Sequence, residues 1–323
     1  DVALMRLLAS AIARFHSAAQ HRRDHGGHAG MQWVIDGNAA GFAEFGANIF
    51  EPAACIRVTD TARAELGRRV GLLDARREAG FVRQCHGDLH LRNIVLLDGH
   101  PTLFDAVEFN DEIACIDVLY DLAFLLMDLW RRRLPQHGNE LLNGYLAESG
   151  DWDALSLLPL FLSCRAAVRA KTNATAAGIQ RGTTAVNELQ RSAREYLALA
   201  ERLLHDGEPC VIAIGGFSGS GKSTLARGLA PCVGRVPGAV VLRTDEIRKR
   251  LCGVAPLDRL GAEAYLATVS REVYATATSL ARSVVPAGHS GIVDAVFGGP
   301  CIHLLLHQWG QYPTRADGID RHS

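Results

Sequence analysis

The chain has 323 residues, of which 48% are hydrophobic and 21% are charged, so its length and composition predict about two domains with sizeable cores. The formal net charge of −1 gives no support to a surface for nucleic acid or anionic membranes, so we expect neither partner. The apolar runs are far shorter than the roughly 20 residues that span a bilayer. The cysteines lie far apart and form no C-x-x-C pair, which favours free thiols in the cytoplasm.

The amino-terminal part of the chain is predicted to be largely helical. Residues 1–20 carry apolar side chains at helical spacing, and a helix with a basic face is expected from Thr61 to Glu78. Residues 31–84 otherwise mix short apolar segments with helical ones. Because the chain begins abruptly, without an initiator Met or preceding strands, we expect its start to be truncated.

The next segment carries the pattern H-G-D-x-x-x-x-N at residues 86–93, followed by two apolar stretches around a turn at 98–101. This order predicts a hairpin with Asp88 and Asn93 on its first arm and Asp105 on its second. Phosphoryl transfer uses such a set: one carboxylate accepts the proton of the attacking hydroxyl, and an amide and another carboxylate hold Mg²⁺. The alternative is a hairpin whose Asp and Asn side chains only stabilise turns.

This part of the chain resembles the aminoglycoside phosphotransferase family, a kinase-like fold whose hallmark is the same H-G-D-x-x-x-x-N pattern, followed by an Asp on the next strand. The resemblance implies that Asp88 is the catalytic base and that Asn93 and Asp105 are metal ligands. It also implies a structural role for an Asp of the following helix, a position matched by Asp117 and Asp121.

One part of the family's pattern is missing from this chain. In the family, a preceding β-rich lobe supplies a glycine-rich loop over ATP and a lysine that pairs with its phosphates. Residues 1–87 are predicted to be mostly helical and contain no lysine. We therefore expect the kinase-like half to lack its own ATP-binding loop and lysine and to be catalytically impaired.

Residues 122–206 are predicted to be helical. The helix expected at 161–171 carries Arg165 and Arg169 one turn apart, which favours a solvated or salt-bridged face. The alternative is a face that addresses an anionic group. A glycine and a proline within 205–209 end the last helix and mark a domain boundary.

The clearest motif follows that boundary. Residues 211–214 predict a strand buried on both faces, and residues 216–223 fit the phosphate-loop pattern G-x-x-x-x-G-K-[ST] ahead of a helix. Glycines let backbone N–H groups point at phosphate oxygens, Lys222 is expected to reach the β- and γ-phosphates, and Ser223 is expected to bind Mg²⁺. The alternative is a flexible Gly/Ser loop. The expected phosphate contacts are Gly216, Ser218, Gly219, Ser220, Gly221, Lys222, Ser223 and Thr224.

Two further buried strands are expected at 239–243 and 291–297, with a long helix at 262–287 between them. This alternation predicts a doubly wound parallel sheet with its ligands at the carboxyl ends of the strands. Asp294 is expected to contact Mg²⁺ there through a water molecule. Asp245 is interpreted either as a helix N-cap or as a catalytic carboxylate that faces the γ-phosphate and the acceptor.

The second half resembles the small P-loop kinases, such as gluconate, shikimate and adenylylsulfate kinases. Together the halves resemble bacterial proteins in which an aminoglycoside phosphotransferase-like domain is fused to a P-loop ATP-binding domain. Arg243 and Arg248 are weaker candidates for contacts with the acceptor. The stretch from Gly298 to Ser323 lacks the strands and arginine-bearing lid of those kinases, so we expect a truncated or frame-shifted end.

We therefore expect an α/β multidomain protein. Its expected parts are a helical kinase-like lobe with a catalytic β-hairpin at 1–206, an incomplete P-loop domain at 207–297 and an irregular tail at 298–323. The expected function is ATP- and Mg²⁺-dependent phosphoryl transfer to a small hydroxylated metabolite, with the P-loop domain as the competent site. A nucleotide-binding regulatory or remnant protein is the alternative, and an aminoglycoside phosphotransferase ranks lowest. The expected catalytic residues are Asp88, Lys222 and Asp245, and the expected metal ligands are Asn93, Asp105, Ser223 and Asp294.

Overall fold

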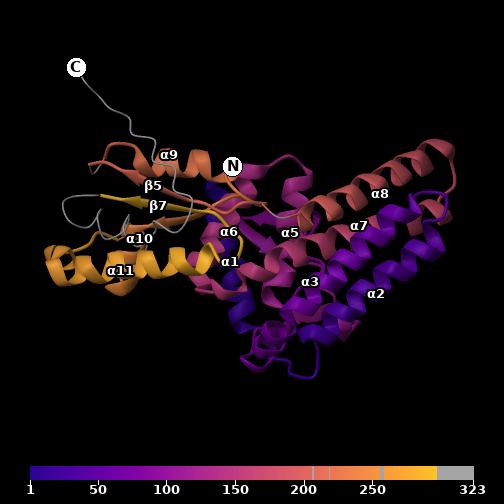
Figure 1. Cartoon of the computed structure of the whole chain (residues 1–323), viewed down its shortest axis with the longest axis horizontal. Helices are drawn as coiled ribbons and strands as arrows, with labels where there is room; N and C mark the ends of the chain where they lie inside the picture. The colour runs from indigo at the N-terminus through magenta and orange to yellow at the C-terminus, as the bar shows by residue number, and fades with distance from the viewer. Residues whose placement is uncertain (206, 218, 255–257, 297–323) are drawn as a thin grey trace, which may run out of the picture. The chain divides into compact units, whose positions relative to one another are not determined.

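The computed structural model describes residues 1–205, 207–217, 219–254 and 258–296. The expected phosphate contact Ser218 and the expected tail at 298–323 lie outside these residues. The chain divides into two compact units (Figure 1). The first unit consists of residues 1–149 and 157–205, and the second consists of 150–156 and the residues after 205.

The first unit is mainly helical. The amphipathic helix expected at 1–20 is confirmed as α1, which buries Leu8 and Ile12. The helix expected to begin at Thr61 instead begins at Pro52, because the proline occupies the first helical position, where its missing N–H costs nothing. The helices are α1 (Ala3–Ala18), α2 (Gly27–Phe45), α3 (Pro52–Glu78), α4 (Asp111–Ala114), α5 (Val118–Arg131), α6 (Pro135–Ser149), α7 (Leu158–Ile179) and α8 (Thr183–Leu204).

Helix α5 forms the core of the first unit, because every residue from Val118 to Leu129 is buried. It packs against α6 and α7, and α7 in turn packs along α8. A helix that is apolar on every face is stable only when other elements surround it. The polar residues of α5 are therefore buried with it and need partners inside the unit.

Two small antiparallel sheets flank this helical core. Strand β1 (Val82–Gln84) pairs with β4 (Cys115–Asp117), and β2 (Ile94–Leu97) pairs with β3 (His100–Leu103). The predicted hairpin is confirmed as β2–β3, but the prediction that the motif residues lie on its arms is wrong. The 3₁₀ turn η1 (Leu91–Asn93) bends the chain ahead of β2, where the N–H of Asn93 donates to the carbonyl of His90 at 2.9 Å. Asp88 precedes this turn, Asn93 ends it, and Asp105 follows β3.

The second unit is an α/β domain. Its sheet has the strand order β5-β7-β6 with both pairings parallel. Helix α9 covers one face of the sheet, and α10 and α11 cover the other (Figure 1). This arrangement confirms the predicted parallel sheet with helices on both faces. Its elements are β5 (Val211–Gly215), α9 (Lys222–Leu229), η3 (Ala230–Cys232), β6 (Val240–Arg243), α10 (Thr244–Leu251), η4 (Ala262–Tyr265), α11 (Ala267–Val284) and β7 (Gly291–Ala295).

Two details of the second unit differ from the sequence predictions. The single helix expected at 262–287 is divided into η4 and α11, because Leu266 has an extended ψ of 151° that interrupts the helical backbone. The segment 150–156 with its short turn η2 (Asp153–Leu157) was expected in the first domain, yet it belongs to the second unit. The buried imidazole of His289 contacts the carbonyl of Leu155 at 3.0 Å and ties the segment to β7.

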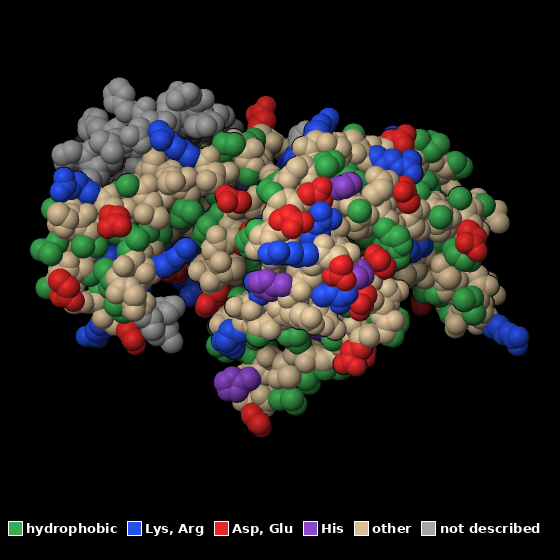
Figure 2. All heavy atoms as spheres, turned by 90° about the horizontal axis from the view of Figure 1, so that it is seen from below, with side chains coloured by type: hydrophobic (Ala, Val, Ile, Leu, Met, Phe, Trp, Pro, Cys, Tyr) green, Lys and Arg blue, Asp and Glu red, His purple; other side chains and the backbone are tan. Residues whose placement is uncertain are grey.

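On the face drawn in Figure 2, basic and acidic side chains of the described residues are interspersed rather than gathered by sign. None of the described helices combines the length and the apolar character that crossing a membrane requires. The cysteines within the described residues are free thiols, and Cys232 and Cys252 are exposed.

Candidate functional site

A glycine-rich loop joins the end of β5 to the start of α9. The described residues from 215 to 221 are exposed, so the loop is open to a ligand. Gly216 has a φ of 152°, and a Cβ added to it would lie 2.8 Å from the hydroxyl of Ser220. Gly221, directly before α9, is left-handed with a φ of 87°. Glycine is favoured at both positions, so the loop shape depends on the residues of the motif.

Lys222 is the first residue of α9, and its side chain folds back over the loop. The ammonium donates to the carbonyl of Phe217 at 2.6 Å, and the N–H of Ser220 donates to the same carbonyl at 3.2 Å. The positive group is thus held at the mouth of the loop, beside the amino end of a helix. Both features favour an anion at this position.

Ser223 and Asp294 meet at the carboxyl ends of the parallel strands. The hydroxyl of Ser223 donates to Oδ2 of Asp294 at 2.5 Å. Asp294 lies opposite Ile214 of β5 in the sheet register, and it is only 5% exposed. A hydroxyl and a carboxylate are the hard oxygen ligands that Mg²⁺ prefers. The donor set therefore fits the predicted divalent cation.

Arg243 adds a positive charge to this pair. It is the last residue of β6 and lies opposite Asp294 in the register. Its guanidinium contacts Asp294 Oδ2 at 3.3 Å, donates to the hydroxyl of Ser223 at 3.2 Å and pairs with Glu246. Burial acts to lower the pKa of Arg243, but the carboxylates of Glu246 and Asp294 raise it overall. The guanidinium is therefore charged under all physiological conditions.

The interpretation of Asp245 as an N-cap is wrong. Helix α10 begins at Thr244 with Arg243 as its N-cap residue, and no side chain caps it. The hydroxyl of Thr244 instead donates to the carbonyl of Asp294 at 3.1 Å, which brings the start of α10 to the Ser223–Asp294 pair. The carboxylate of Asp245 is half exposed and lies 3.7 Å from Lys249.

Arg248 does not have the exposed position that contact with an acceptor requires. It is 8% exposed, and its guanidinium donates to the carbonyl of Ala264 at 2.6 Å and to the hydroxyl of Ser270 at 3.2 Å. These bonds connect α10 to η4 and α11. Arg243, the other arginine considered, is the one at the strand ends.

A second polar centre lies in the first unit, where Asp88 and Asn93 are in contact. The amide of Asn93 donates to the backbone carbonyl of Asp88 at 3.0 Å and to its carboxylate at 3.2 Å. His90 lies 3.4 Å from the same carboxylate. The hydrogen bond from His90 lowers the pKa of Asp88, and the charges of Arg169 and Arg165 act in the same direction. The carboxylate is therefore held in its ionised form.

Backbone hydrogen bonds bring Asp105 beside this pair. The N–H of Phe104 donates to the carbonyl of Asn93 at 3.1 Å, and the N–H of Val107 donates to the carbonyl of His86 at 2.9 Å. Asp105, between these two anchors, is exposed and has a φ of 61°. The three residues expected from the motif are thus gathered on one segment.

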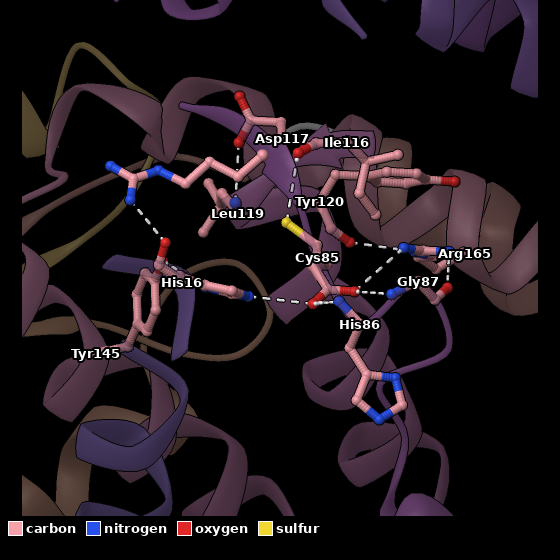
Figure 3. Close-up of polar contacts among 12 residues, drawn as sticks. His16, Cys85, His86, Gly87, Ile116, Asp117, Leu119, Tyr120, Tyr145 and Arg165 are labelled. Carbon is pink, nitrogen blue, oxygen red and sulfur yellow. Dashed lines mark hydrogen bonds and ion pairs between the residues drawn. The ribbon is translucent and has the colours of Figure 1, made fainter. Parts of the chain in front are cut away.

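Asp121 of α5 supports the loop that carries Asp88 through hydrogen bonds to its backbone. The carboxylate of Asp121 accepts from the N–H groups of His86 at 3.1 Å and Gly87 at 2.9 Å, two residues that are labelled in Figure 3. His16 lies 3.1 Å from the same carboxylate and Arg165 lies 3.8 Å from it. Burial acts to raise the pKa of Asp121, but the hydrogen bond with His16 and the charge of Arg165 lower it overall.

Arg165 is buried and forms an ion pair with Asp121, so the expected salt-bridged face is confirmed for this residue and the solvated one is not. The Arg165 guanidinium donates to the carbonyls of Gly87 at 3.2 Å and Tyr120 at 3.1 Å and stacks on the Tyr120 ring at 3.9 Å. Sequence reasoning also missed His16. The available signal was a histidine on the apolar face of the first helix, which on its own indicates a core residue.

His16, Cys85 and Asp121 bring ligand atoms within 4.8 Å of one another. Burial raises the pKa of Cys85 well above its usual range, so the thiol stays protonated. The Asp121 oxygens already accept from two backbone N–H groups. The hydrogen bonds of Asp121 to the loop and to His16 account for this cluster as a structural support.

Comparisons with known proteins bear on both units. Residues 211–301 match the model of a family described as an AAA domain. This match supports a P-loop-type AAA domain within the second unit. Over 302 residues, or 91% of this chain, the sequence is 33% identical to Uncharacterized protein Mb2027c of Mycobacterium bovis and to Uncharacterized proteins MT2060 and Rv2004c of two Mycobacterium tuberculosis strains. The chain spans 58% of the length of each of these relatives.

Proposed function

We propose that the second unit binds Mg²⁺·ATP and transfers the terminal phosphoryl group to a hydroxyl of a small metabolite. The observation that carries this proposal is the 2.5 Å contact between Ser223 and the buried Asp294, directly behind an exposed glycine loop. The match of residues 211–301 to an AAA domain supports nucleotide binding by the same segment. The expected tail after residue 297 does not enter this proposal.

The residues of the loop have distinct roles in this proposal. Backbone N–H groups of the loop and the first turn of α9, including Gly216, Gly219, Ser220, Gly221 and Thr224, bind the phosphate oxygens. Lys222 exchanges the carbonyl of Phe217 for the β- and γ-phosphates. Ser223 and Asp294 hold Mg²⁺, which neutralises the charge that develops on the phosphates.

Asp245 is proposed as the group that accepts the proton of the attacking hydroxyl. Its carboxylate is half exposed and belongs to the first turn of α10. The neighbouring residue Thr244 is bonded to the carbonyl of Asp294, so the two carboxylates belong to one end of the sheet. A carboxylate close to the metal site is suited to orient and deprotonate an acceptor.

A second candidate function concerns the first unit, which we propose to be a kinase-like lobe. The contact of Asn93 with Asp88 and the two backbone bonds around Asp105 favour a phosphoryl-transfer centre. Asp88 would act as the base, and Asn93 and Asp105 would hold a metal ion. We rank this centre below that of the P-loop domain at 207–297, and an aminoglycoside acceptor ranks last because a fold does not fix a substrate.

An acceptor screen with radiolabelled ATP tests both candidates. We expect label transfer by the unchanged chain and by Asp88→Ala, and loss of transfer in Lys222→Ala. Arg282→Gln removes one exposed positive charge elsewhere in the second unit and serves as the matched control. Transfer that survives Lys222→Ala but is lost in Asp88→Ala would assign the reaction to the first unit. ATP affinity without transfer to any acceptor would support the alternative of a nucleotide-binding regulatory protein.

A further inference from the structure

Arg243 occupies a particular place among the groups at the strand ends. The same two oxygens that form the proposed Mg²⁺ site, Oγ of Ser223 and Oδ2 of Asp294, are both contacted by its guanidinium, at 3.2 and 3.3 Å. The third contact, with Glu246 of α10, fixes the other side of the group. The guanidinium is therefore bound at the position where a cation would find its ligands.

A divalent cation cannot share these ligands with a guanidinium at low energetic cost. Two positive groups a few ångströms apart repel each other strongly where the surroundings are partly buried. The side chain of Arg243 is 19% exposed and that of Asp294 is 5% exposed, so solvent screens this repulsion only in part. Metal binding at Asp294 thus requires the guanidinium to leave Ser223 and Asp294.

An arriving nucleotide changes this balance. A phosphate chain on the adjacent glycine loop brings several negative charges to the strand ends. Arginine pairs with phosphate oxygens as readily as with a carboxylate, through parallel N–H donors. The guanidinium then gains a new anionic partner as it loses Asp294. A metal ion alone offers no such compensation.

We propose that Arg243 is an internal counter-ion that keeps Ser223 and Asp294 closed to a divalent cation until nucleotide phosphates arrive. This inference rests on the proposed function, because it concerns the same metal ligands. Its consequence is specific: the metal enters with the nucleotide, and free metal binds poorly. Glu246 favours the closed state by holding the guanidinium near Asp294.

The test is a titration of the chain with Mn²⁺ alone, followed by the electron paramagnetic resonance signal of the free ion. We expect Arg243→Gln to bind Mn²⁺ at least about tenfold more tightly than the unchanged chain, because a full positive charge has been removed from the site. Arg282→Gln removes an exposed charge from the same unit and should bind as the unchanged chain does. Arg243→Lys retains the charge and should also resemble the unchanged chain. Adding Asp294→Asn to Arg243→Gln should abolish the gain.

Equal Mn²⁺ affinity in Arg243→Gln and Arg282→Gln would overturn the inference. A second measurement needs only the unchanged chain: Mn²⁺ should bind far more tightly with a non-hydrolysable ATP analogue present than without it. In a chain that binds the analogue, and with Mn²⁺ held by the analogue alone subtracted, equally tight binding in both conditions would also overturn the inference, even if Arg243→Gln fails to fold. A gain of Mn²⁺ binding in Arg243→Gln, with no nucleotide affinity in the unchanged chain, would overturn the proposed function. It would still support the inference that Arg243 keeps a divalent cation away from Ser223 and Asp294.

Discussion

The two polar centres of this protein are built in different ways. In the second unit, a contiguous loop and the register of parallel strands bring Ser223, Asp294 and Arg243 together. In the first unit, the loop of Asp88 depends on Asp121, a carboxylate buried in a helix and supported by His16 and Arg165. The difference indicates that one centre is fixed by its backbone, whereas the other is fixed by side chains distant in the chain. Changes to the centre of the second unit should affect binding, and changes to the centre of the first unit should affect stability.

The largest effect is expected from Asp121→Ala. The substitution leaves the N–H groups of His86 and Gly87 and the buried Arg165 without their carboxylate, which should lower the free energy of unfolding by about 3–5 kcal/mol. Urea denaturation measures the change. Asp60→Ala, at an exposed carboxylate on α3, should change stability by less than about 0.5 kcal/mol. If both variants unfold at the same urea concentration, Asp121 does not support the loop.

Lys222→Ala should weaken ATP binding and leave stability almost unchanged, in contrast to Asp121→Ala. Loss of charged hydrogen bonds to the phosphates should weaken ATP binding by about 1.5–3 kcal/mol, while the free energy of unfolding changes by less than about 0.5 kcal/mol. Among the described residues, the ammonium of Lys222 has a polar contact only with the carbonyl of Phe217, which explains the small effect on folding. Calorimetric titration with ATP, beside Arg282→Gln as the charge control, measures the affinity. Unchanged affinity in Lys222→Ala would break the assignment of the loop.

Gly216→Ala tests whether the backbone determines the second centre. At a φ of 152° with Ser220 Oγ 2.8 Å from the new Cβ, alanine should cost about 1–3 kcal/mol in stability, ATP affinity or both. Gly228→Ala is the matched control, because it lies inside α9 with no atom near the new Cβ. It should stabilise the chain by up to about 1 kcal/mol. Thermal unfolding and ATP titration compare the two variants. Equal stability and equal ATP affinity in Gly216→Ala and Gly228→Ala would show that the backbone at Gly216 does not determine the second centre.

The smallest effect concerns the pKa of Asp88. His90→Phe removes the hydrogen bond to the carboxylate and keeps a ring against Phe124, 5.5 Å away, so the pKa of Asp88 should rise. Because the pKa of Asp88 is lowered in the native state, the ionised Asp88 carboxylate stabilises the fold at pH values above its unfolded pKa. This stabilisation is lost as the pH falls through the native pKa of Asp88. The carboxylate is 41% exposed, so this contribution stays below about 1 kcal/mol.

Titration of the Asp88 carboxyl carbon by nuclear magnetic resonance measures that pKa. Arg169→Gln should raise it less than His90→Phe does, because Arg169 acts through its charge rather than through a hydrogen bond. A larger rise in Arg169→Gln would show that charge, and not His90, holds the carboxylate ionised.

Local features of this structure are predictable from the sequence, whereas contacts between residues distant in the chain are not. The glycine loop, the strands beside it and the hairpin β2–β3 are local patterns, so they are predictable from neighbouring residues. Asp294 was predicted as a partner of the loop because parallel strands end at one edge of a sheet. The contact of Arg243 with Ser223 was not predictable, since it depends on β7 lying between β5 and β6.

In the first unit, the motif residues were predictable but their supports were not. The pairing of His16 with Asp121 joins residues far apart in sequence, and a single sequence contains no signal for that contact. The position of Asp88 before the hairpin depends on the short 3₁₀ turn η1, which apolar periodicity does not reveal. The break at Leu266 depends on one backbone angle, which apolar periodicity does not reveal.

The central position of β7 has a consequence for the order in which the second unit can form. Among the described strands, β5 and β6 have no hydrogen-bonded contact with each other, and each pairs only with β7, which follows both in the chain. During synthesis from the amino terminus, the phosphate loop therefore leaves the ribosome long before its strand has a partner. Asp294 is delivered by that same late strand. Closure of the sheet and completion of the nucleotide site are thus one event, so a nascent chain that stops before Gly291 has neither.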